Sequence, residues 1–435
     1  MNIAIIGFGS QGRSVYEFYR SRDNQITICD KSTPDDLPSD VQTQLGDNYL
    51  DRLDRFELIF RSPSVHPDQI VKYNDKNILA KVTTNTNEFM RLVPTKNVIG
   101  VTGTKGKGTT SVLIYKMLQA MNKRVYLGGN FGVPPLDLLR ENIGPDDYVV
   151  LELANFQLID LKYSPHIGIC LLFEPEHLDW HGDVNEYFYA KTNLFRHQMS
   201  QDIAIYYALN ESSKRIASTG GGRLIPYYKS PGAFEAGNHI VMDGLPIVDI
   251  SEIKLLGKHN WQNICAAITA VWQIDKDTNA IASVLREFGG LPFRIEFKKE
   301  INNVKYYNDS FSTAPTATVA AMNAIEGEKL LIIGGYDRGL DLSTLALEIK
   351  KKEPELRKVI IIGEARNRVA KNLDQVQFSN YLISDSSDLT EIVFKASEIA
   401  KSGDSLIFSP GFASFDMFKN FEDRGNKFNQ ALLSL

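Results

Sequence analysis

The sequence predicts an α/β protein with several domains, and three observations support this. The chain has 435 residues, too many for one ordinary hydrophobic core. Apolar strands alternate with helical patterns throughout, an order typical of parallel sheets covered by helices on both faces. Three blocks each open with a strand that runs into glycine. We therefore expect three domains, over residues 1–93, 94–292 and 293–435.

The composition limits the class of protein. Hydrophobic residues make up 43% and charged residues 23% of the chain, as in soluble globular proteins. The net charge of −5 provides no overall positive field for nucleic acid or an anionic membrane. No apolar run approaches the ~20 residues of a membrane span, and no leader precedes the first strand. The three dispersed cysteines indicate reduced thiols. We expect a cytoplasmic, monomeric enzyme that binds neither nucleic acid nor membrane.

The first block contains a glycine loop between two strands. The strands are expected at Asn2–Ile6 and Ile26–Cys29, and the segment Gly7-Phe-Gly-Ser-Gln-Gly12 follows the first. Asp30 ends the second strand. This order imitates a dinucleotide-binding fingerprint, in which a diphosphate lies at a helix N-terminus and the acid accepts hydrogen bonds from a ribose or base. NAD and UDP both satisfy these demands, so this loop alone leaves both open.

The second block contains the most informative segment, Val98–Ser111. An apolar strand breaks into a loop with glycines at 103, 106 and 108, and a helical pattern follows. Glycines let backbone N–H groups surround an anion, and the helix directs its positive end to the same point. Lys107 adds a charge for the β- and γ-phosphates. The segment therefore predicts a triphosphate site and an ATP-consuming enzyme, which favours UDP over NAD in the first block.

Acids and histidines at the ends of the next two strands predict a metal site. The strand Tyr148–Leu151 ends at Glu152, where a carboxylate can hold the Mg²⁺ of bound ATP. The next strand is followed by the cluster Glu174-Pro-Glu-His177-Leu-Asp179-Trp-His181. Zinc is disfavoured because no cysteine lies nearby and triphosphate chemistry prefers Mg²⁺ with oxygen ligands. By its residue type and position alone, Lys191 indicates only a solvated helical lysine.

Taken together, these motifs resemble the Mur ligase family, the ATP-dependent amide-forming enzymes of peptidoglycan precursor assembly. The resemblance covers nearly the whole chain in order, and it is carried by Thr102-Gly-Thr-Lys-Gly-Lys107, Gly128-Gly-Asn130, Glu152-Leu-Ala-Asn-Phe-Gln157, Glu176-His-Leu-Asp179, Tyr189-Ala-Lys191, Gly257-Lys-His-Asn260, Gly290-Leu-Pro-Phe-Arg294, Asn308-Asp-Ser310, Ser409-Pro-Gly-Phe-Ala-Ser414 and Phe418-Lys-Asn-Phe421. It implies an N-terminal Rossmann-like UDP-binding domain, a central P-loop-type ATPase domain with a parallel sheet, and a mobile Rossmann-like C-terminal domain. It also implies addition of glutamate to UDP-N-acetylmuramoyl-L-alanine through an acyl phosphate.

The resemblance also implies roles for individual residues. Those expected to bind the UDP substrate are Ser10, Gln11, Asp30 and Asn130. Those expected to bind ATP are Gly103, Thr104, Lys105, Gly106, Lys107, Gly108, Thr109, Asn260, Arg294 and Asp309. The implied Mg²⁺ ligands are Thr109, Glu152, His177 and a carbamylated Lys191, and the implied catalytic residues are Lys107, His177 and Lys191. The acceptor amino acid is expected at Thr313, Arg338, Ser414 and Phe421.

The chain departs from the family pattern at several positions. Gly108 stands where a Ser or Thr is usual, so Thr109 or water is expected to supply the hydroxyl. Phe311 and Arg338 replace lysines, and a guanidinium can clamp a carboxylate through two hydrogen bonds. D-Glutamate is the expected acceptor, and L-glutamate stays open. A folylpolyglutamate-synthase-like L-glutamate ligase is the alternative enzyme, and an ATP-binding protein without activity is the third hypothesis.

Overall fold

A computed structural model describes residues 1–435 except 21–22, 35, 131, 179 and 256, and the side chain of residue 259 is also left undescribed. The described chain divides into two compact units. The first unit comprises Met1–Glu252 with Trp261–Arg286, and the second comprises Ile253–Asn260 with Glu287–Leu435. The predicted boundary between residues 93 and 94 thus lies within the first unit. The predicted hinge at Gly289–Pro292 lies just after the change of unit at Arg286.

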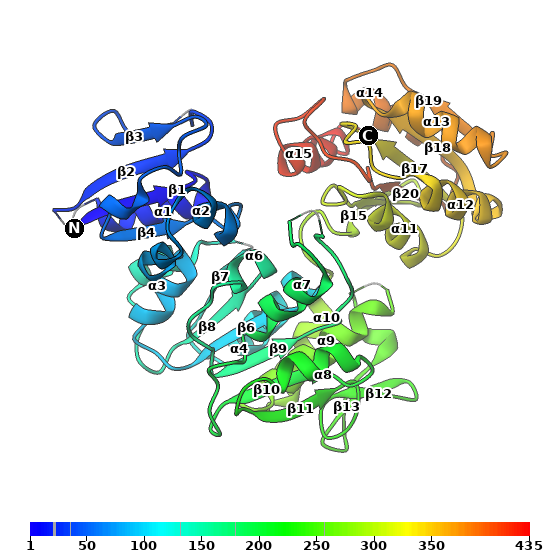
Figure 1. The fold of residues 1–435 in the computed structure, drawn as a ribbon. Helices are drawn as coiled ribbons and strands as arrows, with labels where there is room; N and C mark the ends of the chain where they lie inside the picture. The colour runs from blue at the N-terminus through cyan, green and yellow to red at the C-terminus, as the bar shows by residue number, and fades with distance from the viewer. Residues whose placement is uncertain (21–22, 35, 131, 179, 256) are drawn as a thin grey trace. The chain divides into compact units, whose positions relative to one another are not determined.

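The N-terminal sheet of the first unit has five parallel strands in the order β3-β2-β1-β4-β5 (Figure 1). Its strands are β1 (Asn2–Ile6), β2 (Gln25–Asp30), β3 (Gln42–Leu45), β4 (Leu58–Arg61) and β5 (Val82–Thr83), and its helices are α1 (Ser10–Tyr19), α2 (Pro67–Tyr73) and α3 (Asn85–Leu92). The strands predicted from the apolar runs at 2–6 and 26–29 are confirmed. Ile3, Ile5 and Ile6 are almost fully buried, because helices and loops cover both faces of β1.

The second sheet of the first unit has six parallel strands in the order β11-β10-β9-β6-β8-β7. The strands are β6 (Val98–Thr102), β7 (Val125–Gly129), β8 (Tyr148–Glu152), β9 (Ile167–Cys170), β10 (Ile203–Tyr207) and β11 (Arg223–Tyr227). The helices are α4 (Lys107–Ala120), α5 (Pro135–Leu138), α6 (Asn155–Leu158), α7 (Val184–Thr192), α8 (Glu211–Ala217), α9 (His259–Val271) and α10 (Thr278–Glu287). Because β6, β8 and β9 are neighbours, the predicted phosphate loop, Glu152 and the histidine cluster follow adjacent strand ends.

The sheet of the second unit also has six strands, in the order β15-β16-β20-β17-β18-β19 (Figure 1). They are β15 (Glu296–Ile301), β16 (Val304–Asn308), β17 (Lys329–Gly334), β18 (Leu356–Ile362), β19 (Tyr381–Ile383) and β20 (Ser405–Phe408), with helices α11 (Pro315–Ala324), α12 (Ser343–Lys351), α13 (Arg366–Gln375), α14 (Leu389–Ile399) and α15 (Phe421–Ala431). Along β17, Leu331 and Ile333 enter one apolar cluster, whereas Leu330 and Ile332 enter another. This alternation confirms a sheet that is buried on both faces.

The expectation that every sheet is parallel is wrong in two places. β12 (Phe234–Ala236), β13 (His239–Met242) and β14 (Leu245–Asp249) form a separate antiparallel sheet. β15 pairs antiparallel with β16 at the edge of the second-unit sheet. The two-residue turns at Asp243-Gly244 and Asn302-Asn303 have positive φ at both positions, as type I′ hairpins require. These short turns leave no room for a crossover helix. Their Asn, Asp and Gly residues are types that tolerate positive φ and therefore favour a hairpin.

No helix among the described residues combines the length and apolar character that crossing a membrane requires. Cys29, Cys170 and Cys265 are buried free thiols.

Candidate active site

The loop between β6 and α4 is shaped by two glycines at positions where a side chain would strain the backbone and crowd its neighbours. Gly103 and Gly106 have φ values of +149° and +86°. A Cβ on Gly106 would lie 2.1 Å from Asn263 Oδ1, and one on Gly103 would lie 2.6 Å from the Leu171 Cβ. Gly106 caps α4, so the N–H groups of the first helical turn have no partners within the helix. The loop therefore presents backbone donors and a helix dipole at one point, which suits a phosphate.

Two lysine side chains donate to the same carbonyl of this loop. Lys191 Nζ donates to Gly103 O at 3.0 Å, and Lys107 Nζ donates to the same oxygen at 3.2 Å and to Thr104 O at 3.0 Å. Lys191 is fully buried on α7 and lies 4.5 Å from the centre of the Tyr187 ring. Burial, reinforced by the charge of Lys107, lowers the pKa of Lys191 to about 7. Lys191 is thus a buried amine with a substantial neutral population at physiological pH, rather than a solvated surface lysine.

The other residues of this loop that are predicted to bind ATP differ in their burial and hydrogen bonding. The Thr104 hydroxyl donates to Glu174 O at 2.8 Å and contacts the Tyr187 hydroxyl at 3.0 Å. Its backbone N–H donates to Leu172 O, so Thr104 already uses its polar groups within the protein. Lys105 is exposed. Gly108 and Thr109 are buried in the first turn of α4, and three buried hydroxyls nearby have no hydrogen-bond partner among the described residues: Thr102, Thr110 and Ser111.

Glu152 ends β8 and is buried against the neighbouring loop. Asn130 Nδ2 donates to Glu152 Oε1 at 3.3 Å, and the Asn130 N–H donates to Glu152 O at 2.8 Å. A Cβ on Gly129 would lie 2.2 Å from Glu152 O, so only glycine permits this approach. The structure thus brings together a predicted UDP-substrate residue and a predicted Mg²⁺ ligand.

His177 lies in the left-handed region, with φ of +57°. Its side chain is part-exposed, and its ring lies 4.9 Å from that of Phe156 and 6.5 Å from that of Tyr187. Tyr187 therefore contacts both His177 and Lys191. Asp179, a member of the predicted polar cluster, lies outside the described residues.

The first glycine loop is organised by Asp30. Asp30 Oδ2 accepts the Phe8 N–H at 2.8 Å, while its other oxygen accepts from Ser32. Gly7 has φ of +84°, and a Cβ there would lie 2.6 Å from the Ser62 Cβ. Ser10 is exposed at the first position of α1. The Gln11 amide donates to Gly129 O at 3.2 Å, which ties this loop to the second sheet.

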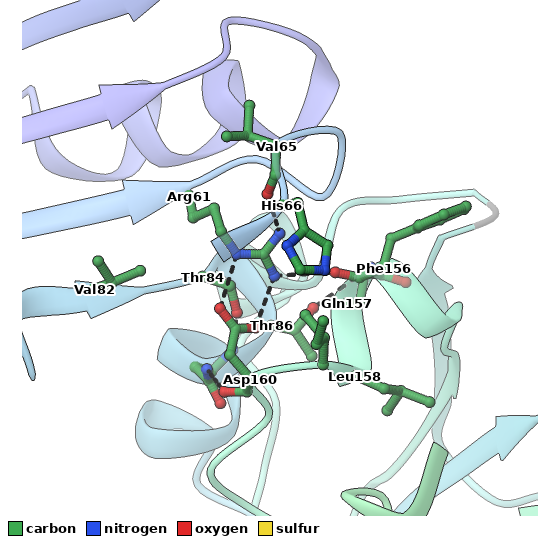
Figure 2. Close-up of polar contacts among 12 residues, drawn as sticks. Arg61, Val65, His66, Val82, Thr84, Thr86, Phe156, Gln157, Leu158 and Asp160 are labelled. Atoms are coloured by element: carbon green, nitrogen blue, oxygen red, sulfur yellow. Dashed lines mark hydrogen bonds and ion pairs between the residues drawn. The ribbon is translucent and has the colours of Figure 1, made fainter. Parts of the chain in front are cut away.

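Sequence reasoning missed the ion pair that joins the two sheets of the first unit. Figure 2 shows the Arg61 guanidinium between Asp160, Phe156 and Val65. Arg61 binds both Asp160 oxygens, at 2.8 and 2.7 Å, and donates to the carbonyls of Ser62, Val65 and Phe156. All five guanidinium N–H groups are used, and the side chain is fully buried. Its position at the end of β4 carried no signal for a partner 99 residues away.

In the second unit, Asp309 is buried at the end of β16. It accepts hydrogen bonds from the Ile295 N–H at 3.0 Å and from the Ser409 hydroxyl at 2.6 Å, and also from Ser312. Burial raises the pKa of Asp309 to about 6. The Arg294 guanidinium carbon lies 3.7 Å from the centre of the Phe311 ring. Phe311 thus offers an aromatic surface to the Arg294 guanidinium.

The predicted acceptor residues also lie in the second unit. Arg338 is exposed and donates to Thr313 O at 2.8 Å, so these two residues are in contact. Ser414 is buried, and Phe421 begins α15 with its ring 5.0 Å from that of Phe311. Asn260 is buried and its N–H donates to Gly257 O at 2.9 Å.

Comparison with known proteins shows that the chain is similar to members of one family. The Mur ligase middle domain matches residues 101–271. The UDP-N-acetylmuramoylalanine–D-glutamate ligase of Clostridium tetani is 34% identical over 448 aligned residues, which cover 100% of this chain and 96% of that protein.

Solved structures show the same fold at low sequence identity. The UDP-N-acetylmuramate–alanine ligase of Thermotoga maritima has a TM-score of 0.63 at 16% identity, covering 100% of this chain and 99% of that one. The MurF ligase of Thermotoga maritima, solved in complex with ADP, has a TM-score of 0.59 at 15% identity, covering 99% and 95%.

Proposed function

Because this chain belongs to the Mur ligase family, we propose that it uses ATP to join D-glutamate to UDP-N-acetylmuramoyl-L-alanine in peptidoglycan biosynthesis. The observation that carries the proposal is the meeting of Lys107 and buried Lys191 at the Gly103 carbonyl. A phosphate loop alone fits any nucleotide-binding protein. The second amine, that of the buried Lys191, favours a site that transfers a phosphoryl group. We also propose a cytoplasmic location, because ATP is available there.

We assign the binding of the three substrates to the three predicted domains. Residues 1–93, with the Gly7–Gly12 loop and Asp30, would bind the UDP moiety. Residues 94–292 would bind ATP. Residues 293–435, with Arg338 and Ser414, would bind the amino acid.

In the proposed reaction, the carboxylate of the L-alanyl group attacks the γ-phosphorus of ATP. The bond to ADP breaks and an acyl phosphate forms. The unprotonated amine of glutamate then attacks the acyl carbon, the nitrogen loses a proton, and phosphate leaves as the amide forms. Lys107 would neutralise phosphate charge during the first step. The backbone donors of the loop would hold the β-phosphate, and exclusion of water would protect the acyl phosphate from hydrolysis.

The residues present fit a magnesium site. Glu152 supplies a buried carboxylate at a strand end beside the phosphate loop, and His177 presents a part-exposed imidazole. Mg²⁺ bound by these residues would neutralise the charge that crowds around the transferred phosphoryl group. Thr109 would contribute a hydroxyl from the first turn of α4, because Gly108 has no side chain that could supply one.

We propose that Lys191 joins this ligand set as a carbamate. The neutral amine attacks CO₂, an N–C bond forms, and the nitrogen loses one proton, which converts the neutral amine into an anionic carbamate. Only the neutral amine reacts, and the burial of Lys191 supplies that form, with its pKa of about 7. The resulting carboxylate would offer the oxygen donors that Mg²⁺ prefers.

For the acceptor, we propose that Arg338 binds the side-chain carboxylate of glutamate. Its exposed guanidinium donates one N–H to the Thr313 carbonyl, and a guanidinium has further donors that a ligand can use. Arg338→Ala should therefore raise KM for glutamate at least about tenfold while KM for ATP changes little, since a charged hydrogen bond contributes about 1.5–3 kcal/mol. Initial-rate kinetics with each substrate varied would measure both constants. An unchanged KM for glutamate would exclude this role.

The decisive test measures phosphate release with UDP-N-acetylmuramoyl-L-alanine and ATP in parallel reactions with D-Glu, L-Glu, D-Asp and L-Asp. We expect release with D-Glu, together with the matching product by mass spectrometry. Release with L-Glu alone would correct the stereochemistry. Stimulation by a folate substrate, with none by the sugar nucleotide, would refute the proposal.

A further inference from the structure

The proposed metal ligand His177 lies in a turn that its own backbone does not favour. Its φ of +57° lies in the left-handed region, which only a few per cent of residues other than glycine adopt. The turn closes when the N–H groups of Trp180 and His181 donate to His177 O, at 3.1 and 2.9 Å. A strained backbone persists only where the surrounding structure fixes it. Trp180 and His181 therefore act as anchors that determine the orientation of His177.

Both anchors are embedded in the first unit. His181 is buried, with Nε2 2.8 Å from the Asn155 amide nitrogen and Nδ1 3.2 Å from Glu186 Oε2. The Trp180 ring centre lies 4.5 Å from that of His66 and 4.9 Å from that of Phe156. The Trp180 indole N–H donates to Ser64 O at 3.4 Å.

His66 connects this cluster to the N-terminal sheet. It follows β4 and caps α2, and its Nδ1 accepts the Asp68 N–H at 3.1 Å. Its Nε2 lies 3.2 Å from Glu186 Oε1, an ion-pair distance without the geometry of a full hydrogen bond. Glu186 therefore faces His66 with one oxygen and His181 with the other, and it also accepts the Gly182 N–H at 2.9 Å.

The same three side chains resemble a zinc site, because their donor atoms lie within 4.8 Å of one another. Their hydrogen bonds argue against it. The Asp68 N–H occupies the lone pair of His66 Nδ1, which places the proton on Nε2. The Asn155 amide, in the assigned orientation, likewise places the His181 proton on Nδ1. Both nitrogens that face Glu186 thus carry hydrogen, and a metal requires a lone pair.

We propose that Glu186, His181 and His66 are positioning residues that hold the His177 turn for metal binding. Glu186 bridges the turn to α7, which also carries Lys191, and His66 ties the turn to the loop after β4. That loop borders Gly7, because a Cβ on Gly7 would meet the Ser62 Cβ. The inference rests on the proposed role of His177, and it assigns no contact with substrate to the three positioning residues.

The test compares Glu186→Gln with Asp183→Asn. Glutamine keeps the size of Glu186 but directs an N–H₂ group toward one of the two imidazole N–H groups. Asp183 is an exposed acid that caps the same helix by accepting the Glu186 N–H at 2.8 Å, and asparagine preserves a cap. The control therefore removes the same charge from the same helix terminus without breaking the network.

Metal affinity is measured as Mn²⁺ binding by electron paramagnetic resonance with a non-hydrolysable ATP analogue, and circular dichroism verifies folding. We expect Glu186→Gln to weaken Mn²⁺ binding by about 10- to 100-fold, and Asp183→Asn to leave it unchanged. In the ligase assay, the concentration of Mg²⁺ for half-maximal rate should rise by a similar factor, while kcat at saturating Mg²⁺ falls much less.

A second variant, His66→Asn, retains a cap for α2 but cannot reach Glu186, and we expect a smaller weakening of Mn²⁺ binding. A folded Glu186→Gln variant with the wild-type Mn²⁺ affinity would overturn the inference. So would Zn²⁺ binding, by calorimetry, that the wild-type protein shows and His66→Asn loses. Failure of the proposed function looks different: the wild-type protein would then form no glutamyl product with the sugar nucleotide.

Discussion

Lys191 illustrates how burial changes the chemistry of a single residue. In the sequence it is an ordinary helical lysine, and in the fold it is fully buried beneath the phosphate loop. Desolvation penalises its charged form, and Lys107 adds repulsion. The amine is therefore available for reaction at a pH where an exposed lysine is almost entirely protonated.

Lys191→Ala should lower kcat by about 100-fold or more, because it removes both the amine and the carboxylate proposed to form on it. Bicarbonate or a short carboxylic acid should restore part of the activity by supplying the missing oxygens. Turnover at several acid concentrations would measure the rescue. Lys116→Ala, an exposed lysine on α4, is the control and should keep wild-type turnover.

A variant of Lys191 that keeps wild-type kcat would remove the carbamate from the mechanism. Mass spectrometry and ¹³C NMR of protein in labelled bicarbonate should independently detect the adduct on the wild-type chain and not on the alanine variant.

Asp309 provides a prediction of pH dependence. Burial raises its pKa to about 6 in the fold, above the usual value of 3.8 for an aspartate. The folded state thus binds the proton more tightly, so its contribution to stability is complete below pH 3.8 and is lost as the pH rises through 6. Asparagine does not titrate. As the pH rises from well below 3.8 to well above 6, the unfolding free energy of Asp309→Asn relative to wild type should rise by roughly 3 kcal/mol in total.

Denaturant unfolding at several pH values, monitored by hydrogen exchange in β16 and β20, would measure this difference. The comparison between the two proteins cancels the titration of all other groups. A difference that stays constant from pH 4 to pH 7 would contradict the buried, protonated state of Asp309.

At the scale of elements, the segment from β6 to α4 shows why glycine is required at particular points. Gly106 combines a left-handed φ with the close approach of Asn263, so two separate constraints exclude a side chain. The first constraint belongs to the loop and is visible in its sequence pattern. The second comes from α9, about 150 residues later, and only the packed structure reveals it.

Gly106→Ala should destabilise the first unit by about 1–3 kcal/mol and weaken ATP binding at least tenfold, because the loop must move to accept the Cβ. Thermal unfolding and nucleotide titration would measure the two effects. Asn263→Ala in the same chain relieves the contact but not the positive φ, so the double variant should recover only part of the loss. Full recovery would mean that φ is not a constraint there.

At the scale of the whole molecule, the buried pair Arg61–Asp160 joins the two sheets of the first unit. The side chain of Arg61 is 0% exposed and that of Asp160 is 22% exposed. Such a pair fixes an orientation more than it adds stability, because the desolvation of both charges offsets their attraction. Removing one partner leaves the other charge buried without compensation.

Asp160→Asn should therefore destabilise the first unit by about 3–5 kcal/mol, as measured by chemical denaturation. Arg61→Met with Asp160→Asn removes both charges, and the double variant should be more stable than the sum of the single losses predicts. Additive losses in this cycle would show that the two side chains do not interact. Arg13–Asp36, an exposed pair, is the control and should contribute at most about 1 kcal/mol.

The sequence by itself determined the strands and loops that depend only on interactions between residues close together in the chain. The apolar runs predicted β1, β2, β6 and β8, and the glycines after β1 and β6 predicted anion-binding loops. Parallel sheets gather such loops at adjacent strand ends, so the candidate site could be predicted as a set of residues. The hairpins at β12–β14 and β15–β16 depart from the predicted alternation of strands and helices, because two-residue turns join their strands directly.

Only the tertiary structure decided which of these residues share an environment. Desolvation of Lys191, the partner of Arg61 and the anchors of His177 depend on contacts between segments that lie far apart in the chain. No local pattern encodes a long-range contact, because it arises from the packing of whole elements rather than from the preference of any one residue. The sequence therefore determined what chemistry the chain carries, and the packing decided where each charge is buried and which groups hold it.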